Sequence, residues 1–98
     1  MKKLFISQPM NGKNGDEILR ERKEAIKAAE IYLDESVDVI DSFFQNAPAD
    51  ASPLWFLGKS LELLSTADVV YFASDWENAR GCKIEHMCAV EYGIDRIE

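Results

Sequence analysis

DVVYFA (residues 68–73), followed by GCKIEH (residues 81–86), is the stretch that decides the fold of this chain. The first run is apolar enough to predict a buried strand. The second run opens a helix that we expect to continue to about residue 92. Ligands of open α/β sheets bind at the edge where strands end and helices begin. This junction is therefore the first place to look for chemistry.

Glu85 is the chemically interesting side chain of this junction, because it follows Gly81 near the start of the helix. The helix dipole favours a negative charge in the first turns, so we expect Glu85 to stay ionised. An ionised carboxylate can act as a nucleophile or stabilise a cationic transition state. The same residues also fit a second interpretation, a solvated helix glutamate beside a helix-starting glycine.

The N-terminal part of the chain repeats the order of strand and helix. Residues 4–7 predict a buried strand, and Pro-x-Asn-Gly at 9–12 predicts a turn. Asn14 with Glu17 forms a capping-box pattern before a helix over about 16–34, and a second strand follows over 37–41. Residues 42–52 lack periodicity and predict a functional or mobile loop. A second helix over about 53–65 begins at Pro53 after Ser52, and residues 94–97 predict a last strand.

This alternation predicts one α/β domain over residues 1–98. Strands that alternate with helices at this spacing form parallel sheets with right-handed crossovers. We expect a flavodoxin-like three-layer α/β/α sandwich with a parallel sheet of about four strands in the order 2-1-3-4. A crevice should then lie between residues 7–12 and residues 74–85.

Composition narrows the classes of partner. The chain has 98 residues and a net charge of −7, with no basic stripe for nucleic-acid polymers or anionic membranes. No apolar run approaches the length of a membrane span or a signal segment, so we expect a cytoplasmic protein. Cys82 and Cys88 do not have the spacing of a zinc or redox motif, and there is one histidine. We expect no metal and no organic cofactor. Cys82 has two interpretations: its pKa is lowered by the helix start, or it is a reduced cysteine that helps to pack the helix.

The whole chain resembles the nucleoside 2-deoxyribosyltransferase superfamily, which includes the 2'-deoxynucleoside 5'-phosphate N-hydrolases, and it is most similar to a branch of short bacterial and phage members. Three features carry the resemblance: FIS at 5–7, ADVV at 67–70 and Gly81-x-x-x-Glu85. In the family the last feature reads like Gly-x-Gly-x-Glu, and its glutamate is the catalytic nucleophile. The resemblance implies that Glu85 attacks the sugar C1' and displaces the base. Another base or water then resolves the glycosyl-enzyme.

Three positions depart from the family pattern. Lys83 replaces the second glycine, Phe5 stands where a tyrosine is frequent, and Ser60 stands where the enzymes carry an aspartate. In the enzymes that aspartate helps to hold the base or to move a proton. Protonation of the leaving base therefore needs another donor here, and position alone offers Asp41, Asp75 and His86.

Several other side chains are candidates for binding a nucleoside or nucleotide. The loop residues Ser7, Gln8, Asn11 and Gly12 can hold sugar hydroxyls or a 5'-phosphate, or form an ordinary turn. Asp41 can bind a ribose hydroxyl or tie a loop, and Arg80 beside Gly81 can contact a phosphate or remain a surface arginine. Trp76 is the best candidate for stacking on a base, whereas Phe43, Phe44 and Trp55 fit core or subunit packing better.

Three functions follow from these patterns. The first is a deoxyribosyltransferase or N-hydrolase that uses Glu85. The second is a non-catalytic nucleotide-binding module, which the serine at position 60 favours. The third is a small structural or interaction protein with the aromatic segment 42–57 as its contact. For a chain this short the resemblance also implies a homodimer or higher homo-oligomer.

Overall fold

A computed structural model describes residues 1–98, and its four strands form one parallel sheet in the order β2-β1-β3-β4. This order confirms the predicted small flavodoxin-like α/β fold. The elements are β1 (Lys2–Ser7), α1 (Gly15–Leu33), β2 (Val37–Val39), α2 (Pro53–Leu64), β3 (Val69–Phe72), the 3₁₀ turn η1 (Trp76–Asn78), α3 (Arg80–Glu91) and β4 (Asp95–Ile97).

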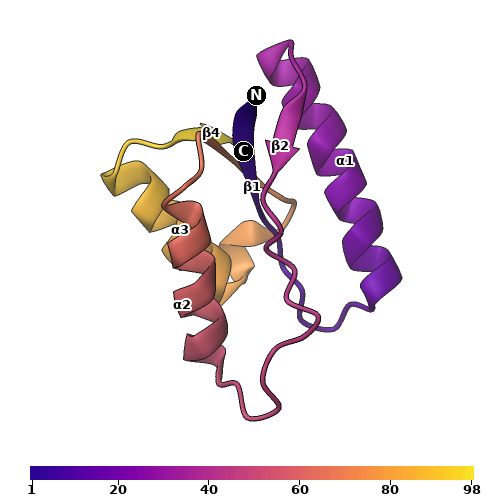
Figure 1. Ribbon diagram of the computed structural model, residues 1–98, viewed down its shortest axis with the longest axis vertical. Coiled ribbons are helices and arrows are strands. Elements are labelled where there is room, and N and C mark those ends of the chain that lie inside the picture. Colours follow the sequence, from indigo (N-terminus) through magenta and orange to yellow (C-terminus); the bar gives the residue numbers. More distant parts are fainter.

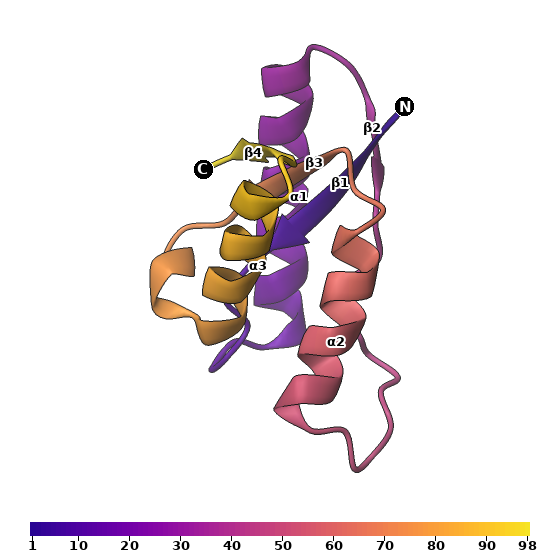
Figure 2. The same ribbon diagram turned by 90° about the vertical axis from the view of Figure 1, so that its left-hand side faces the viewer.

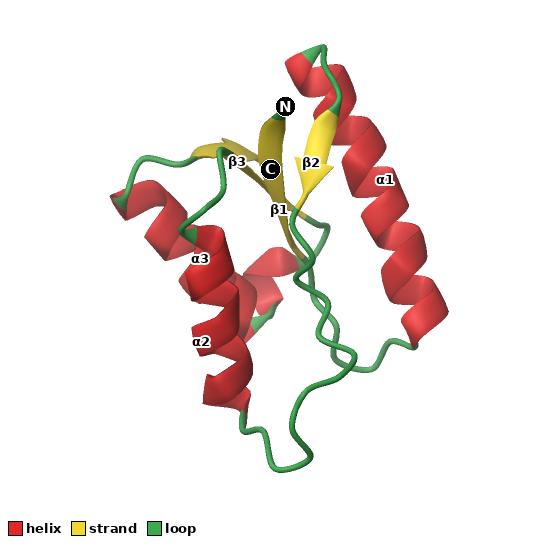
Figure 3. Ribbon diagram, viewed as in Figure 1, coloured by secondary structure: helices red, strands yellow, loops and turns green.

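Helices cover both faces of the sheet. Helix α1 lies on one side, and α2 and α3 lie next to each other on the opposite side (Figures 1 and 2). Figure 3 shows the strands enclosed between these layers, with the long loop after β2 extending beyond the sheet. The predicted three-layer sandwich is therefore confirmed. None of these helices combines the length and the apolar character needed to cross a membrane.

The core has one cluster on each face of the sheet because side chains alternate along β1. Leu4 and Ile6 point toward α1, where they pack with Ala25 and Ala29. Phe5 points the other way and packs with residues of β3, α2 and α3, namely Val70, Phe72, Leu64 and Ala89. Residues 4–7 are thus buried on both faces, as expected for a central parallel strand.

The helix starts follow the sequence signals. Asn14 Oδ1 accepts a hydrogen bond from the backbone N–H of Glu17 at 2.9 Å, and Ser52 Oγ accepts one from Trp55 at 3.2 Å. These caps satisfy N–H groups that have no partner inside their own helices. They set the directions in which α1 and α2 leave their loops.

The helix and strand ends lie within two residues of the sequence prediction, and two differences bear on the site. Strand β2 ends at Val39, two residues before the predicted end at Asp41, although the Ile40 N–H still donates to the Leu4 carbonyl at 2.9 Å. The predicted loop 74–78 contains the 3₁₀ turn η1, which starts after Asp75 in the left-handed region at φ 72°. Both differences lie at the C-terminal edge of the sheet.

Candidate functional site

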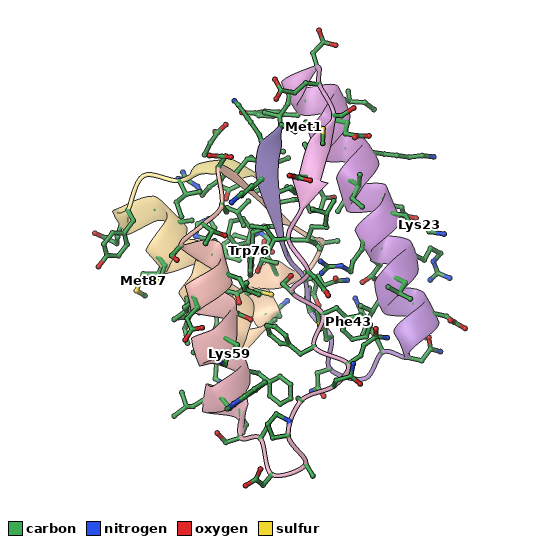
Figure 4. The ribbon with its side chains drawn as sticks, in the orientation of Figure 1. Met1, Lys23, Phe43, Lys59, Trp76 and Met87 are labelled. Atoms are coloured by element: carbon green, nitrogen blue, oxygen red, sulfur yellow. The ribbon has the colours of Figure 1, made fainter.

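A cavity of about 1010 Å³ opens at the C-terminal edge of the parallel sheet. Its lining comes from the loops after β1 and β2, the first turns of α2, and the segment from Asp75 into α3. The sequence predicted a crevice between residues 7–12 and 74–85, and the cavity lies there. The loop after β2 adds a third wall with Ser42, Phe43 and Phe44. Figure 4 shows Phe43 on this loop, between the α1 side and the α2 side of the molecule.

Glu85 lines the cavity and is only 7% exposed. It shares the inner face of α3 with Cys82 and Ala89, at the helical spacing of three and four residues. Its carboxylate Oε1 accepts a 2.6 Å hydrogen bond from the hydroxyl of Ser7, the last residue of β1. A side chain of α3 is thereby fixed against the end of the central strand. The alternative of a solvated surface glutamate does not describe Glu85.

Burial raises the pKa of Glu85 to about 6, whereas the hydroxyls of Ser7 and Ser60 act in the opposite direction by favouring the carboxylate. The helix dipole alone led us to expect no such rise, and desolvation is the larger effect. At neutral pH most molecules still carry an ionised Glu85. The group is therefore a partly desolvated carboxylate, which is a stronger nucleophile than one fully hydrated in water.

For Cys82 the sequence left two interpretations, a lowered pKa or simple packing, and the structure decides between them. Burial raises the pKa of its thiol to about 11, a neighbouring Ser7 hydrogen bond lowers it, and the negative charge of Glu85 raises it further. Cys82 is only 4% exposed, and its thiol stays protonated at neutral pH. The prediction of a lowered pKa for Cys82 is therefore wrong, and Cys82 is a buried, protonated thiol in the cavity wall.

A buried arginine is the feature of the site that the sequence patterns missed. Arg22 is 7% exposed and donates from Nη1 to Gln8 Oε1 at 3.0 Å. Its Nη2 donates to the Ile40 carbonyl at 3.1 Å and to Ser42 Oγ at 3.3 Å. Burial lowers its pKa, and the charge of Asp41 opposes that change. The signal in the sequence was its register, because Arg22 lies on the α1 face that also carries Ile18, Ala25 and Ala29.

Gln8 lines the cavity, but its amide group is engaged inside the protein. Its Nε2 donates to the Ile18 carbonyl at 3.3 Å and to Glu21 Oε1 at 3.2 Å, while its Oε1 accepts from Arg22. Both amide hydrogens are thus used. Gln8 supports the wall of the cavity, and its contact with a sugar stays a prediction.

The structure places five of the nine predicted site residues in the cavity lining, a sixth in contact with Glu85, and three elsewhere. Asn11, Arg80 and Gly81 line it with Gln8 and Glu85, and Ser7 holds Glu85. Outside it are Gly12 at φ 80°, the exposed Asp41, and Trp76. Their contacts with a ligand stay predictions.

Trp76 is half-buried and packs against the core beside α3. Its ring stacks on His86 with centroids 4.0 Å apart and contacts Phe72 at 5.3 Å. His86 in turn lies 2.6 Å from a carboxylate oxygen of Glu98. Met87 on α3 is 63% exposed and points outward in Figure 4. Of the three candidate proton donors, only Asp75 lines the cavity, and its Oδ1 accepts from Asn78 at 2.6 Å.

The aromatic wall of the cavity consists of Phe43, Phe44 and Phe56. Trp55 lies behind it, edge-on to Phe44 at 6.0 Å and to Phe56 at 5.1 Å. Phe44 and Trp55 therefore pack as expected, but Phe43 and Phe44 also face the cavity. Sequence position gave no sign of this, because the loop after β2 has no periodic pattern that fixes which side chains turn inward.

Gly81 and Ser60 show how the family motif sits in this chain. A methyl group added at Gly81 would meet no atom within 4 Å, so the open space beside it belongs to the cavity. Ser60 lines the cavity, and its hydroxyl lowers the pKa of Glu85. Lys83 is exposed on the outer side of α3. The change at position 60 thus falls inside the site and the change at 83 outside it.

No group of three or more His, Cys, Asp and Glu side chains is placed to hold a metal ion. No family model, no curated protein and no solved structure matches this chain.

Proposed function

We propose that the protein cleaves or transfers the N-glycosidic bond of a nucleoside or nucleotide, with Glu85 as the nucleophile at the sugar C1'. The observation that supports this most is the Glu85 carboxylate itself. It is buried at a cavity of about 1010 Å³, is held by Ser7 at 2.6 Å, and is ionised above a pKa of about 6. A cavity of this size accommodates a nucleotide. The resemblance to the nucleoside 2-deoxyribosyltransferase superfamily adds independent support.

The proposed reaction has two displacements at one carbon. Glu85 Oε attacks C1', and the C1'–N bond breaks with its electron pair going to the base. Water or a second base then attacks C1', the C1'–O bond to Glu85 breaks, and the configuration of the sugar is retained. The proton lost by the attacking water or base balances the one that the departing base takes up from solvent. The positive charge that develops on the sugar is stabilised by the same carboxylate. The planar base fits against the aromatic wall of Phe43, Phe44 and Phe56.

One observation favours the second function, a non-catalytic nucleotide-binding module. Retaining glycosidases carry a second carboxyl group about 5 Å from the nucleophile, which protonates the leaving group. Here the neighbour of Glu85 on α2 is Ser60, and the only other carboxylate in the lining, Asp75, is hydrogen-bonded to Asn78. An enzyme with this cavity would need a substrate whose base can leave without protonation by a protein carboxyl group. A binding module needs no such acid, so the absence of a free acid favours the binding module.

Self-association is part of the same proposal. Helix α2 is rich in large apolar side chains, yet only Leu64 is buried, and Leu54, which does not line the cavity, is 76% exposed. Helices with this composition are normally covered. Its two charges, Lys59 and Glu62, neutralise each other at 3.6 Å, so this face does not add repulsion between copies of a chain with net charge −7. We therefore propose a homo-oligomer that covers α2.

The deciding experiment is an incubation with nucleosides and 5'-nucleotides, ribo and deoxy, with and without an acceptor base. Chromatography follows free base and exchanged nucleoside. We expect release or exchange by the wild-type protein and none by Glu85→Ala. Glu24→Ala, an exposed glutamate on α1, is the matched control and should keep full activity.

The outcomes separate the functions. Turnover by the wild type and by the control but not by Glu85→Ala supports the enzyme. No turnover, with a raised melting temperature in the presence of one nucleotide, contradicts the enzyme and supports the binding module. Neither turnover nor stabilisation removes both and leaves an interaction protein.

A further inference from the structure

Arg22 occupies a position where the fold would ordinarily place an apolar residue. It lies on the inner face of α1 with Ile18, Ala25 and Ala29, and it is 7% exposed. A charge buried there is unfavourable unless hydrogen bonds replace its water shell. Placement of an arginine at this point therefore indicates a specific role for the guanidinium group.

The guanidinium group joins two loops that have no other link of this kind at the cavity. Nη1 donates to Gln8 of the loop after β1, and Nη2 donates to the Ile40 carbonyl and to Ser42 of the loop after β2. Gln8 and Ser42 both line the cavity. The planar fork of one arginine therefore spans the gap between two of its walls.

The same loops carry the candidate ligand contacts. The first loop continues to Asn11, and the second continues to Phe43 and Phe44. Residues 40–52 contain no helix or strand, and few of their backbone groups take part in backbone hydrogen bonds. A long loop of this kind is held in one position mainly by such side-chain anchors.

We propose that Arg22 is a positioning residue that fixes the loop after β1 against the loop after β2 and thereby sets the shape of the ligand cavity. Arg22 makes no hydrogen bond to Glu85 or Ser7, so we expect it to act on binding and not on the nucleophile. Lysine cannot replace it, because a single ammonium group cannot reach Gln8 Oε1, the Ile40 carbonyl and Ser42 Oγ with the geometry of the fork. The proposal rests on the proposed function only in taking this cavity as the ligand site.

Hydrogen–deuterium exchange read by mass spectrometry tests the anchor without any ligand. We compare Arg22→Lys with Arg20→Lys, a matched change at an exposed arginine of the same helix. Faster exchange is expected in residues 8–14 and 40–52 of Arg22→Lys, with β3 and α3 unchanged. A purely stabilising residue would instead raise exchange in all segments together, and that result, or unchanged loops, would overturn the proposal.

A second variant keeps the test decisive if Arg22→Lys folds poorly. Ser42→Ala removes one acceptor on the second loop only, so exchange should rise in 40–52 and not in 8–14.

Trp55 gives an optical signal, because it packs on Phe44 and is the only tryptophan left after Trp76→Phe. In that background its emission should change with Arg22→Lys and stay constant with Arg20→Lys.

The functional arm uses 2'-deoxyadenosine 5'-monophosphate as the probe. If it is turned over, Arg22→Lys should raise KM about tenfold and change kcat less than about twofold, because uniform binding is lost while the nucleophile is untouched. A fall in kcat at constant KM would contradict the assignment. If the wild type neither binds nor consumes any nucleotide, the proposed function fails, and the exchange experiment still decides on Arg22.

Discussion

At the scale of single residues, the burial of Glu85 has opposite effects on stability and on reactivity. The cavity removes water from a carboxylate and raises its pKa from 4.5 to about 6. The folded protein therefore binds this proton more tightly than the unfolded chain does. Stability from this group is fully present below pH 4.5 and is lost as the pH rises through about 6. Active sites commonly keep such unfavourable groups for their function.

Glu85→Gln should consequently stabilise the protein in neutral and alkaline solution. The shift of the pKa corresponds to ~2 kcal/mol at pH 8, and the advantage should disappear near pH 4, where wild-type Glu85 is also neutral. Urea denaturation at both pH values measures the difference. Glu24→Gln is the exposed control and should show no such pH dependence. A Glu85→Gln protein that is less stable at pH 8 than at pH 4, relative to wild type, would contradict the burial account.

Ser7 should set where Glu85 titrates. Its hydroxyl donates to the carboxylate at 2.6 Å, so Ser7→Ala removes a donor that favours the charged form. We expect the Glu85 pKa to rise above about 6. Carbon-13 NMR titration of the glutamate carboxyl groups measures this directly, and the acid limb of any pH–rate profile should move to higher pH. An unchanged titration would show that the hydrogen bond has no influence on the charge.

Arg22 and Gln8 show why the site was predicted only in part at this scale. Glu85, Asn11, Arg80 and Gly81 line the predicted crevice, and Ser7 contacts Glu85, because all five lie at strand ends or a helix start, where topology alone brings residues together. Arg22 was missed because an isolated arginine in a charged helix looks solvated. Only its register with Ile18 and Ala25 marks it as buried. Gln8 was found, but its hydrogen-bond partners depend on Arg22 and Glu21 and cannot be derived without them.

At the scale of elements, α3 has a glycine near each end with a different physical role. Gly81 is helical and faces open space in the cavity, whereas Gly93 follows the helix at φ 68° and turns the chain toward β4. Gly81→Ala should therefore keep or raise stability, by about 0.5 kcal/mol, since the unfolded chain loses freedom. Gly93→Ala should cost about 1 kcal/mol, because a Cβ is unfavourable in the left-handed region.

Denaturant unfolding of both variants measures this pair, and ligand turnover separates them further. The added methyl of Gly81→Ala occupies cavity space, so nucleotide turnover should fall while stability does not. Gly93→Ala should lose stability and keep turnover under conditions where it is folded. If Gly81→Ala binds and converts nucleotides like the wild type, the cavity beside Gly81 is not where the ligand lies.

The elements themselves were predictable because their signals are local. Asn14 and Ser52 act as the expected caps, and the apolar runs at 4–7 and 69–72 form the expected strands. The end of β2 and the turn η1 were not predicted. After β2 the Ile40 carbonyl accepts from Arg22, and no local pattern encodes such a tertiary contact. The turn η1 has local backbone hydrogen bonds, but it starts from Asp75 in the left-handed region, which the residue type alone does not predict.

At the scale of the whole molecule, helix α2 has apolar surface that no other part of the single chain covers. Leu54 is 76% exposed on a helix in which most of the other residues are apolar. Sedimentation velocity should show an assembly of at least two wild-type chains at micromolar concentration. Leu54→Glu should sediment as a monomer, because it places a charge in the proposed contact.

Ile31→Glu is the matched control for this prediction. Ile31 is 81% exposed, but it lies on α1, whose outer surface is charged. This variant should assemble like the wild type. A monomeric wild type, or an assembly that survives Leu54→Glu, would contradict the role of α2 and leave its apolar surface without a partner.

The central claim is that Glu85 forms a covalent bond to a sugar, and intact-protein mass spectrometry tests it most directly. The protein is mixed with 2'-deoxyadenosine 5'-monophosphate and with deoxyadenosine, quenched in acid within seconds, and digested to locate any adduct. We expect one added deoxyribosyl or deoxyribosyl-phosphate group on the peptide that contains Glu85, and none in Glu85→Gln. Base release without any adduct on that peptide, or an adduct that persists in Glu85→Gln, would contradict it.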